Sequence, residues 1–208
     1  MNTILPFSVV VLLAVSGVSQ TVIQLPKPVT TGGKPLMEAL SDRHSGREFT
    51  DTIMPLQQLS NLLWAAYGIN RPEEQRRTAP SARNVQEFDL YVAQKSGVYL
   101  WKSDSNQLEL IKAGDIRGRI GRQPFVASAS LVLIFVADYD RMGKMEEDTK
   151  EFYSAADCGY ISQNVYLFAA SENLNTVVIG SVDRETVAIL LGLKASQKVV
   201  FAQPVGKP

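Results

Sequence analysis

The stretch LVLIFVAD, residues 131–138, decides the fold class. It is a continuous apolar run, rich in β-branched and aromatic residues, that meets its first charged residue only at Asp138. A run of this length and composition is typical of a β-strand that is covered on both faces. The sequence therefore predicts a central strand here, with other elements packed on both sides of it.

Four further segments predict strands around this one. FDLYVAQ (88–94) and GVYLWKSDSNQLELI (97–111) alternate apolar and polar residues and are separated and folded by turn-forming residues, which predicts a meander. NTVVIG (175–180) predicts a short strand, and KVVFAQPVG (198–206) predicts the last one. The strands follow one another without regular helical crossovers between them.

Four segments with helical periodicity lie before or between these strands. The expected helices cover residues 35–46, 54–69, 145–173 and 183–193, the last capped at Ser181 or Asp183. Neither a βαβ alternation nor a glycine-rich phosphate loop occurs, so the predicted fold class is α+β, a sheet with helices packed on it.

The helix expected over 145–173 carries a stripe of mostly small residues. We expect this stripe to be buried; its members are Ala155, Ala156, Gly159, Ile161 and Val165. The strands available to cover so long a helix are few. A second copy of the chain is the expected partner surface, which predicts a homodimer.

Composition and motif content limit the chemistry. The 208 residues carry 21 basic and 21 acidic side chains, and this balance argues against a general nucleic-acid binder. The single cysteine, Cys158, allows no intramolecular disulfide and is expected to be a small core residue. The single histidine, His44, allows no histidine-pair metal site, and no GxSxG, HExxH or P-loop pattern occurs. Any chemistry is therefore expected to reside on a bound cofactor.

The N-terminus differs in kind from the rest. No charged side chain precedes Lys27, and the apolar run 9–15 is followed by the small residues Gly17 and Ser19. This pattern predicts a secretory signal peptide over 1–19 and an exported, periplasmic protein. The run is far shorter than the ~20 residues that a membrane span needs, so no stable membrane insertion is expected. A buried N-terminal strand and an uncleaved anchor are the alternatives.

The rest of the chain is expected to form one domain. Residues 20–35, rich in Pro, Thr, Gly and Lys, predict an extended arm. Residues 36–208 then form the folded domain, because a chain of this size buries roughly 70% of its unfolded surface in one core.

The segment SDRHSGREF (41–49) gathers an unusual set of polar groups. Arg43 and Arg47 are four residues apart, and on a helix they would share one face and repel each other. Two guanidinium groups and the Ser45 hydroxyl can together bind a phosphate. The alternative is a solvated helix end, with Arg47 paired to Asp51.

Two other positions are weaker candidates for ligand contacts. TAPSARN (78–84) places the hydrogen-bonding side chains of Ser81 and Asn84 beside the rigid Pro80, although most such stretches are plain loops. Gly180 follows the strand TVVI and would present an open N–H at a strand end, unless it is only a turn glycine.

RHSGREF, followed some thirty residues later by APSARNVQEFDLYV, resembles the FMN-dependent nitroreductase family. The resemblance extends over residues 36–206. The segments LLWAAYGI, GVYLW and DCGYISQNVYLFA are most similar to its thiazole- and oxazole-forming dehydrogenase branch. It implies a mostly antiparallel central sheet flanked by helices, an intertwined homodimer and an FMN cofactor.

The resemblance also implies roles for particular residues. Arg43, Ser45 and Arg47 would bind the FMN phosphate and ribityl chain, with His44 beside them. Four residues would reach the flavin from the other subunit: Pro80, Ser81, Ala82 and Asn84.

Three more positions complete the implied flavin site. Ile179 and Gly180 would lie near the reactive N5 atom, and Gln123 would face the pyrimidine edge of the ring. No protein acid or base is required, because hydride enters and leaves at N5. The implied activity is that of an oxidoreductase acting on a small organic substrate with an unidentified electron donor or acceptor. NAD(P)H, the usual donor, is not expected outside the cytoplasm.

The sequence departs from the family pattern in two places. Only Lys207 stands where many relatives continue with phosphate-binding basic residues, and Leu174–Asn175 replaces a common Leu-Gly. Asn175 is expected to adopt a left-handed helix-end conformation in its place.

Two functions other than the implied oxidoreductase are left open. One is a flavin-binding protein without turnover, and the other is a flavin-cleaving or deiodinating relative.

Overall fold

Residues 131–138 form strand β7 (Leu131–Asp138), which is buried along nearly its whole length in the computed structural model, whose description covers residues 22–208. β7 lies between β4 and β9 in a seven-stranded sheet of order β1-β6-β5-β4-β7-β9-β8, and every pairing in it is antiparallel. The predicted α+β class is confirmed.

The other strands lie close to where periodicity placed them. The bounds are β1 (Val22–Gln24), β4 (Phe88–Gln94), β5 (Gly97–Lys102), β6 (Gln107–Ala113), β8 (Asn175–Thr176) and β9 (Gln197–Gly206). β1 comes from the predicted arm and pairs with the edge strand β6, which the sequence did not indicate. The segment 175–180 keeps only two residues of ladder, followed by an isolated bridge from Ile179 to Ala202.

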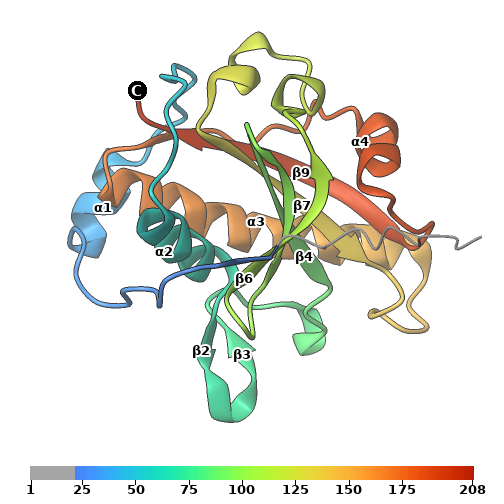
Figure 1. Cartoon of the computed structure of the whole chain (residues 1–208). Coiled ribbons are helices and arrows are strands. Elements are labelled where there is room, and N and C mark those ends of the chain that lie inside the picture. Colours follow the sequence, from blue (N-terminus) through green and yellow to red (C-terminus); the bar gives the residue numbers. More distant parts are fainter. Residues whose placement is uncertain (1–21) are drawn as a thin grey trace, which may run out of the picture.

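The side chains of β7 alternate between two cores. The helices are α1 (Leu36–Asp42), α2 (Leu56–Tyr67), α3 (Glu147–Ser171) and α4 (Arg184–Leu191). Leu133 and Phe135 pack with α2 and α3, whereas Ile134 packs with α4 on the opposite face. In Figure 1, α3 runs behind the sheet, α1 and α2 lie at one of its ends, and α4 lies on the other side of the sheet. Because both faces are covered, β7 needs no polar side.

Four short 3-10 helices and a hairpin complete the connections. The 3-10 helices are η1 (Pro72–Glu74), η2 (Ala82–Asn84), η3 (Arg117–Arg119) and η4 (Pro124–Ser128). The polar stretch 71–86, which the sequence predicts as a loop, begins instead in the projecting hairpin of β2 (Ile69–Arg71) and β3 (Arg76–Arg77) (Figure 1). Among helices in residues 22–208, none is both long and apolar enough to cross a bilayer.

The first helix is shorter than predicted. α1 ends at Asp42, and Arg43 has the non-helical angles φ −59° and ψ 120°. Arg43 and Arg47 therefore do not share a helix face, and the expected repulsion along a helix does not arise. The predicted end at Gly46 is wrong because the backbone of Gly46 bonds to the distant Thr176.

Two further expectations about conformation are corrected. In α3, Ile161 and Val165 are buried as predicted, but the small residues Ala155, Ala156 and Gly159 are exposed on the single chain. The left-handed residue after this helix is Asn173, with φ 55°, and not Asn175. Of the two proposed caps of α4, Asp183 is confirmed, because its carboxylate accepts a hydrogen bond from the Thr186 N–H at 3.1 Å.

Candidate functional site

Residues 43–47 run as extended chain beside strand β8. The Gly46 N–H donates to the Thr176 carbonyl at 3.0 Å. A Cβ atom on Gly46 would overlap the side chain of Asn175, so only glycine fits this close approach. The segment is therefore positioned by contacts with a part of the chain about 130 residues away.

Asn175 holds the same segment through its side chain. Its Oδ1 atom lies 3.1 Å from His44 Nε2, and its Nδ2 donates to the Glu48 carbonyl at 2.8 Å. The Asn175 side chain thus bridges residues 44 and 48. In the place where relatives commonly have glycine, this chain has a residue that fixes the polar cluster.

We call the polar segment Arg43–Arg47 the first cluster. Tyr166, on the buried side of α3, connects this cluster to the segment that contains Ile179 and Gly180. Its hydroxyl accepts a hydrogen bond from the Val178 N–H at 2.9 Å and lies 3.1 Å from Ser45 Oγ. The Arg43 guanidinium lies over the Tyr166 ring, 5.4 Å from its centroid. Sequence reasoning missed Tyr166, because nothing in the periodicity of the helix marks it out from its neighbours.

The two guanidinium groups of the cluster are not neutralised by acids of the same chain. Arg47 donates only to the Ser45 carbonyl at 3.3 Å. The alternative pairing with Asp51 does not form, since Asp51 binds Lys95 at 2.5 Å and the buried Arg117 at 3.0 Å. Within residues 22–208, neither Arg43 nor Arg47 forms a salt bridge. An anion can therefore bind both.

Gln123 lies between η3 and η4, in a stretch that runs beside residues 179–182. The Arg122 N–H donates to the Ser181 carbonyl, and a Cβ atom on Gly121 would contact both Ile179 and Gln123 Oε1. Gln123 Oε1 is buried and accepts no hydrogen bond from the described residues. Buried acceptors are normally paired, so this one is suited to an N–H group of a ligand.

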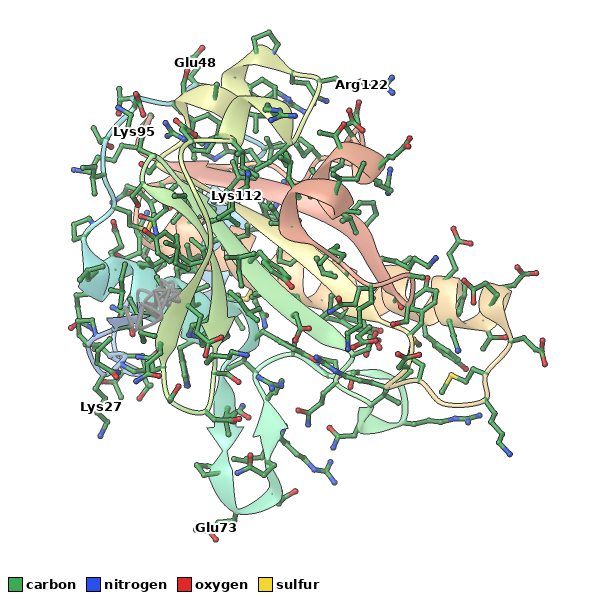
Figure 2. All side chains as sticks on the ribbon, turned by 45° about the vertical axis from the view of Figure 1, so that its right-hand side comes forward. Lys27, Glu48, Glu73, Lys95, Lys112 and Arg122 are labelled. Atoms are coloured by element: carbon green, nitrogen blue, oxygen red, sulfur yellow. The ribbon has the colours of Figure 1, made fainter. Side chains whose placement is uncertain are left out.

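Gly180 is exposed, and the packing around it does not demand a glycine. A Cβ atom there would lie 3.6 Å from the Phe201 ring, which is ordinary contact. The backbone of its neighbour Ile179 is fully paired with Ala202, at 2.8 and 3.2 Å. Across the part of the chain that the structure describes, the Gly180 N–H donates to no acceptor. In Figure 2, Glu48 and Arg122 lie at the same end of the molecule, opposite Glu73 on the hairpin.

A cavity borders the first cluster. It has a volume of about 440 Å³, and its lining includes Lys34, His44 and Asn175. A cavity of about 470 Å³ lies elsewhere, between Trp64 and Trp101, and its lining contains no residue of the predicted site. The predicted polar residues thus gather beside the first cavity, although the second is slightly larger.

The second predicted cluster is the loop Pro80–Asn84. It is held by a different part of α3. The Ala82 N–H donates to Asp157 Oδ2 at 2.8 Å, and Ser81 Oγ accepts from the Gln86 N–H at 2.9 Å. Arg83 and Asn84 both adopt left-handed angles, φ 55° and 56°. Such conformations cost energy in residues other than glycine and persist only where surrounding contacts impose them.

One chain does not bring the two clusters together. Asp157, which holds the loop Pro80–Asn84, and Tyr166, which holds Ser45, are nine positions apart in α3. Nine residues correspond to about 14 Å along a helix and to a rotation of about half a turn, so the two side chains leave on opposite sides. Within one chain, the two clusters are therefore held on different sides of α3.

The sequence pattern of the nitroreductase family matches residues 40–207. The chain belongs to the nitroreductase family. A Methanocaldococcus jannaschii protein classed with the nitroreductases is 31% identical over 183 residues, which cover 83% of this chain and 90% of that protein. The resemblance of RHSGREF and APSARNVQEFDLYV to the nitroreductase family is thereby confirmed for the family as a whole.

Two further relatives agree with this assignment. A crystal structure of a Ralstonia eutropha protein, also classed with the nitroreductases, superposes with a TM-score of 0.86 at 42% identity, covering 92% of this chain and 91% of that one. The NADPH-flavin oxidoreductase of Vibrio harveyi is 30% identical over 105 residues, which are 47% of this chain and 44% of that protein. The nitroreductase fold is shown, and its homologues support an oxidoreductase that uses a flavin.

A buried acidic pair, Glu87 and Asp157, lies behind the second cluster. Sequence reasoning missed this pair. Glu87, completely buried at the start of β4, has its pKa raised by burial to about 7, and the nearby Asp157 carboxylate adds to the shift. Burial also raises the pKa of Asp157. Glu87 directly follows the polar loop, and the polar composition of that loop gave no sign that Glu87 is buried.

We predict that stability falls with rising pH because of Glu87. Its pKa in the folded state lies above the ordinary value of 4.5, so the folded state binds the proton more tightly. The stabilisation is complete below pH 4.5 and is lost as the pH rises to about 7. Allowing for solvent screening, the change in unfolding free energy is about 1–2 kcal/mol.

Urea unfolding across this pH range measures the effect. Glu87→Gln has no carboxyl to titrate and should show a correspondingly flatter pH dependence than the wild type. Glu185→Gln changes an exposed carboxylate on α4 and should keep the wild-type slope. Equal slopes for the wild type and Glu87→Gln would show that Glu87 does not titrate in this range.

Proposed function

We propose that the protein is a homodimeric, FMN-dependent oxidoreductase acting on a small organic substrate. The observation that carries this proposal is the cluster of Arg43, Ser45 and Arg47, which Tyr166 ties to the segment before Gly180. The cluster presents unneutralised positive charge at one end and open hydrogen-bonding groups at the other. FMN has the complementary arrangement, a phosphate at one end and a polar ring at the other.

The first cluster would hold the phosphate. Two guanidinium groups donate charge-assisted hydrogen bonds to phosphate oxygens, each worth about 1.5–3 kcal/mol. The hydroxyl of Ser45 is already oriented by Tyr166 at 3.1 Å, so little side-chain freedom is lost when a ligand binds. His44 is fixed beside them by Asn175.

The residues at the other end fit the flavin ring. Bound FMN would supply the chemistry, by taking up and releasing hydride at its N5 atom. The free Gly180 N–H is suited to bond this edge, and the buried acceptor Gln123 Oε1 is suited to a ring N–H. The protein's own contribution is to bind, orient and shield the ring, so no side chain is assigned as acid or base.

A second copy of the chain would complete the site. The exposed face of α3 carries Ala155, Ala156 and Gly159, flanked by Phe152 and Tyr160, which are 69% and 51% exposed. Small residues flanked by aromatic ones allow close packing of two copies, and family members are typically dimers. The partner's loop Pro80–Asn84 would then reach the ring held by the first cluster.

The finer placement of the protein rests on sequence motifs. We propose the thiazole- and oxazole-forming dehydrogenase branch because LLWAAYGI, GVYLW and DCGYISQNVYLFA match it. We also propose export to the periplasm, with a domain over 36–208 behind an arm over 20–35. The predicted signal peptide, 1–19, lies outside the described residues. An exported enzyme would use an electron donor other than NAD(P)H.

The absorbance spectrum of protein purified without added cofactor tests the central proposal. A flavin spectrum with reduction by a donor and reoxidation by a substrate supports it. Protein that is colourless and takes up no FMN would overturn it. A yellow protein that no donor reduces would instead indicate flavin binding without turnover, and consumption of FMN or dehalogenation of an aromatic substrate would indicate the third function.

Arg47→Ala should weaken FMN binding more than tenfold. The reason is the loss of one charge-assisted contact of about 1.5–3 kcal/mol, measured by fluorescence titration of FMN. Riboflavin lacks the phosphate and should bind the variant and the wild type equally. Arg76→Ala removes an exposed guanidinium paired with Glu74 on the hairpin and should leave FMN affinity unchanged. Wild-type FMN affinity in Arg47→Ala would place the phosphate elsewhere.

Gly159→Glu should give monomers that fold but do not retain FMN. A Cβ atom on Gly159 meets open space, so one chain tolerates the change, whereas two copies packed at this stripe would bury the new charges. Light scattering and flavin content measure the outcome. Ile189→Glu adds the same charge at an exposed position on α4 and should remain dimeric. A monomeric variant with undiminished FMN affinity would contradict the two-chain site.

The mature protein recovered from an exporting host should begin at Gln20. The small residues Gly17 and Ser19 stand at the positions that signal peptidase recognises, and intact-mass measurement reads the new terminus directly. A chain that keeps Met1 would favour the uncleaved alternatives.

A further inference from the structure

We propose that Glu87 and Asp157 are positioning residues that share one proton, and that this proton sets the shape of the Ser81–Asn84 loop and thereby the affinity for the cofactor. The inference rests on the proposed FMN site. It adds a pH-dependent element to that site, built from residues that the flavin itself need not touch.

The burial of the pair and the lack of donors around Glu87 favour a bound proton. Glu87 is 0% exposed and Asp157 is 3% exposed. Neither carboxyl oxygen of Glu87 accepts a hydrogen bond from a donor within residues 22–208. Two neighbouring carboxylates can bond to each other only when one of them is protonated, because ionised carboxylates are acceptors alone. With one proton, Glu87 would donate to the neighbouring Asp157, which contributes to the raised pKa of Glu87, and the pair would carry a single charge.

Neighbouring cations do not replace the proton. The guanidinium of Arg77 lies over the Tyr67 ring and donates to other groups. Arg141 pairs with Asp89 at 2.7 Å and reaches only the backbone carbonyl of Glu87. In the described part of the chain, no salt bridge includes either carboxylate of the pair.

The remaining titratable neighbours do not supply positive charge either. The Tyr67 hydroxyl from α2 is buried without a hydrogen-bond partner among the described residues, and burial raises its pKa. Burial likewise raises the pKa of the Cys158 thiol and of Tyr139. No group of three metal-ligating side chains occurs in residues 22–208, so a bound cation is not indicated. A shared proton is the simplest neutralising species.

The pair controls the loop through one hydrogen bond. Asp157 Oδ2 accepts the Ala82 N–H at 2.8 Å, directly before the left-handed residues Arg83 and Asn84. When the proton leaves, two buried carboxylates repel each other, and Asp157 can relieve the repulsion by turning away from Glu87. The Ala82 N–H then loses its acceptor, and the unfavourable angles of the loop are no longer imposed.

The consequence is a loss of cofactor affinity above neutral pH. A loop held in its binding conformation has already lost the freedom that a relaxed loop must lose on binding. By linkage, a cofactor that binds the ordered loop more tightly also raises the pKa of the pair. Each unit of that rise corresponds to about a tenfold change in the FMN dissociation constant.

Fluorescence titration of the purified protein with FMN, from about pH 5.5 to about pH 8.5, tests this inference. Wild-type affinity should fall about tenfold over the range. Glu87→Gln should keep nearly constant affinity, because its amide donates to Asp157 at every pH, as the protonated carboxyl does. Glu185→Gln, at an exposed position on α4, should retain the wild-type fall. The comparison uses one ligand, so titration of FMN itself cancels between variants.

A second measurement needs no cofactor. The amide signal of Ala82 in a nitrogen–proton correlation spectrum should titrate in the wild type with a midpoint near pH 7 and should stay fixed in Glu87→Gln. Parallel affinity curves for the wild type and Glu87→Gln, or an Ala82 signal that does not move, would overturn the inference. Failure of FMN to bind at any pH would overturn the proposed function and its cofactor link, while the Ala82 titration would still report on the pair.

Discussion

The double-sided burial of β7 is the constraint on which the rest of the structure depends. Alternate residues of this strand enter two separate cores, one completed by α2 and α3 and the other by α4 and η4. A sheet covered in this way has no free polar face on which to place a site. Functional groups are therefore confined to strand ends and to loops, and the long helix α3 becomes the element that positions them.

The role of α3 explains why the predicted site divides. Tyr166 and Asp157 each fix a loop by side-chain hydrogen bonds, but they leave the helix about half a turn apart. The small residues Ala155, Ala156 and Gly159 of the same helix are exposed on the single chain. In the proposed dimer, assembly and cofactor binding would be coupled, because the proposed contact surface and both half-sites belong to the same helix.

Much of the fold could be predicted because its signals are local. The runs that form β7, α2 and α3 show their period in the sequence, and Asp183 caps α4 through a neighbour three residues away. The end of α1 could not be predicted, since Gly46 bonds to Thr176. The burial of the α3 stripe was misjudged because small apolar residues such as Ala155 and Ala156 have the same composition whether or not the chain's own core covers them.

The candidate site was predicted less completely, and the missed residues share a physical cause. Glu87 and Tyr166 matter because of what surrounds them in space, whereas motif reasoning sees only their neighbours in sequence. Replacing a buried carboxyl pair with apolar side chains of similar volume is often neutral or stabilising, so Glu87 and Asp157 are poorly explained by stability alone. Local rules are most often broken where a protein binds or reacts. The buried carboxyl pair and the left-handed loop residues Arg83 and Asn84 meet at Ala82, so in the proposed site this loop is where stability and binding would compete most directly.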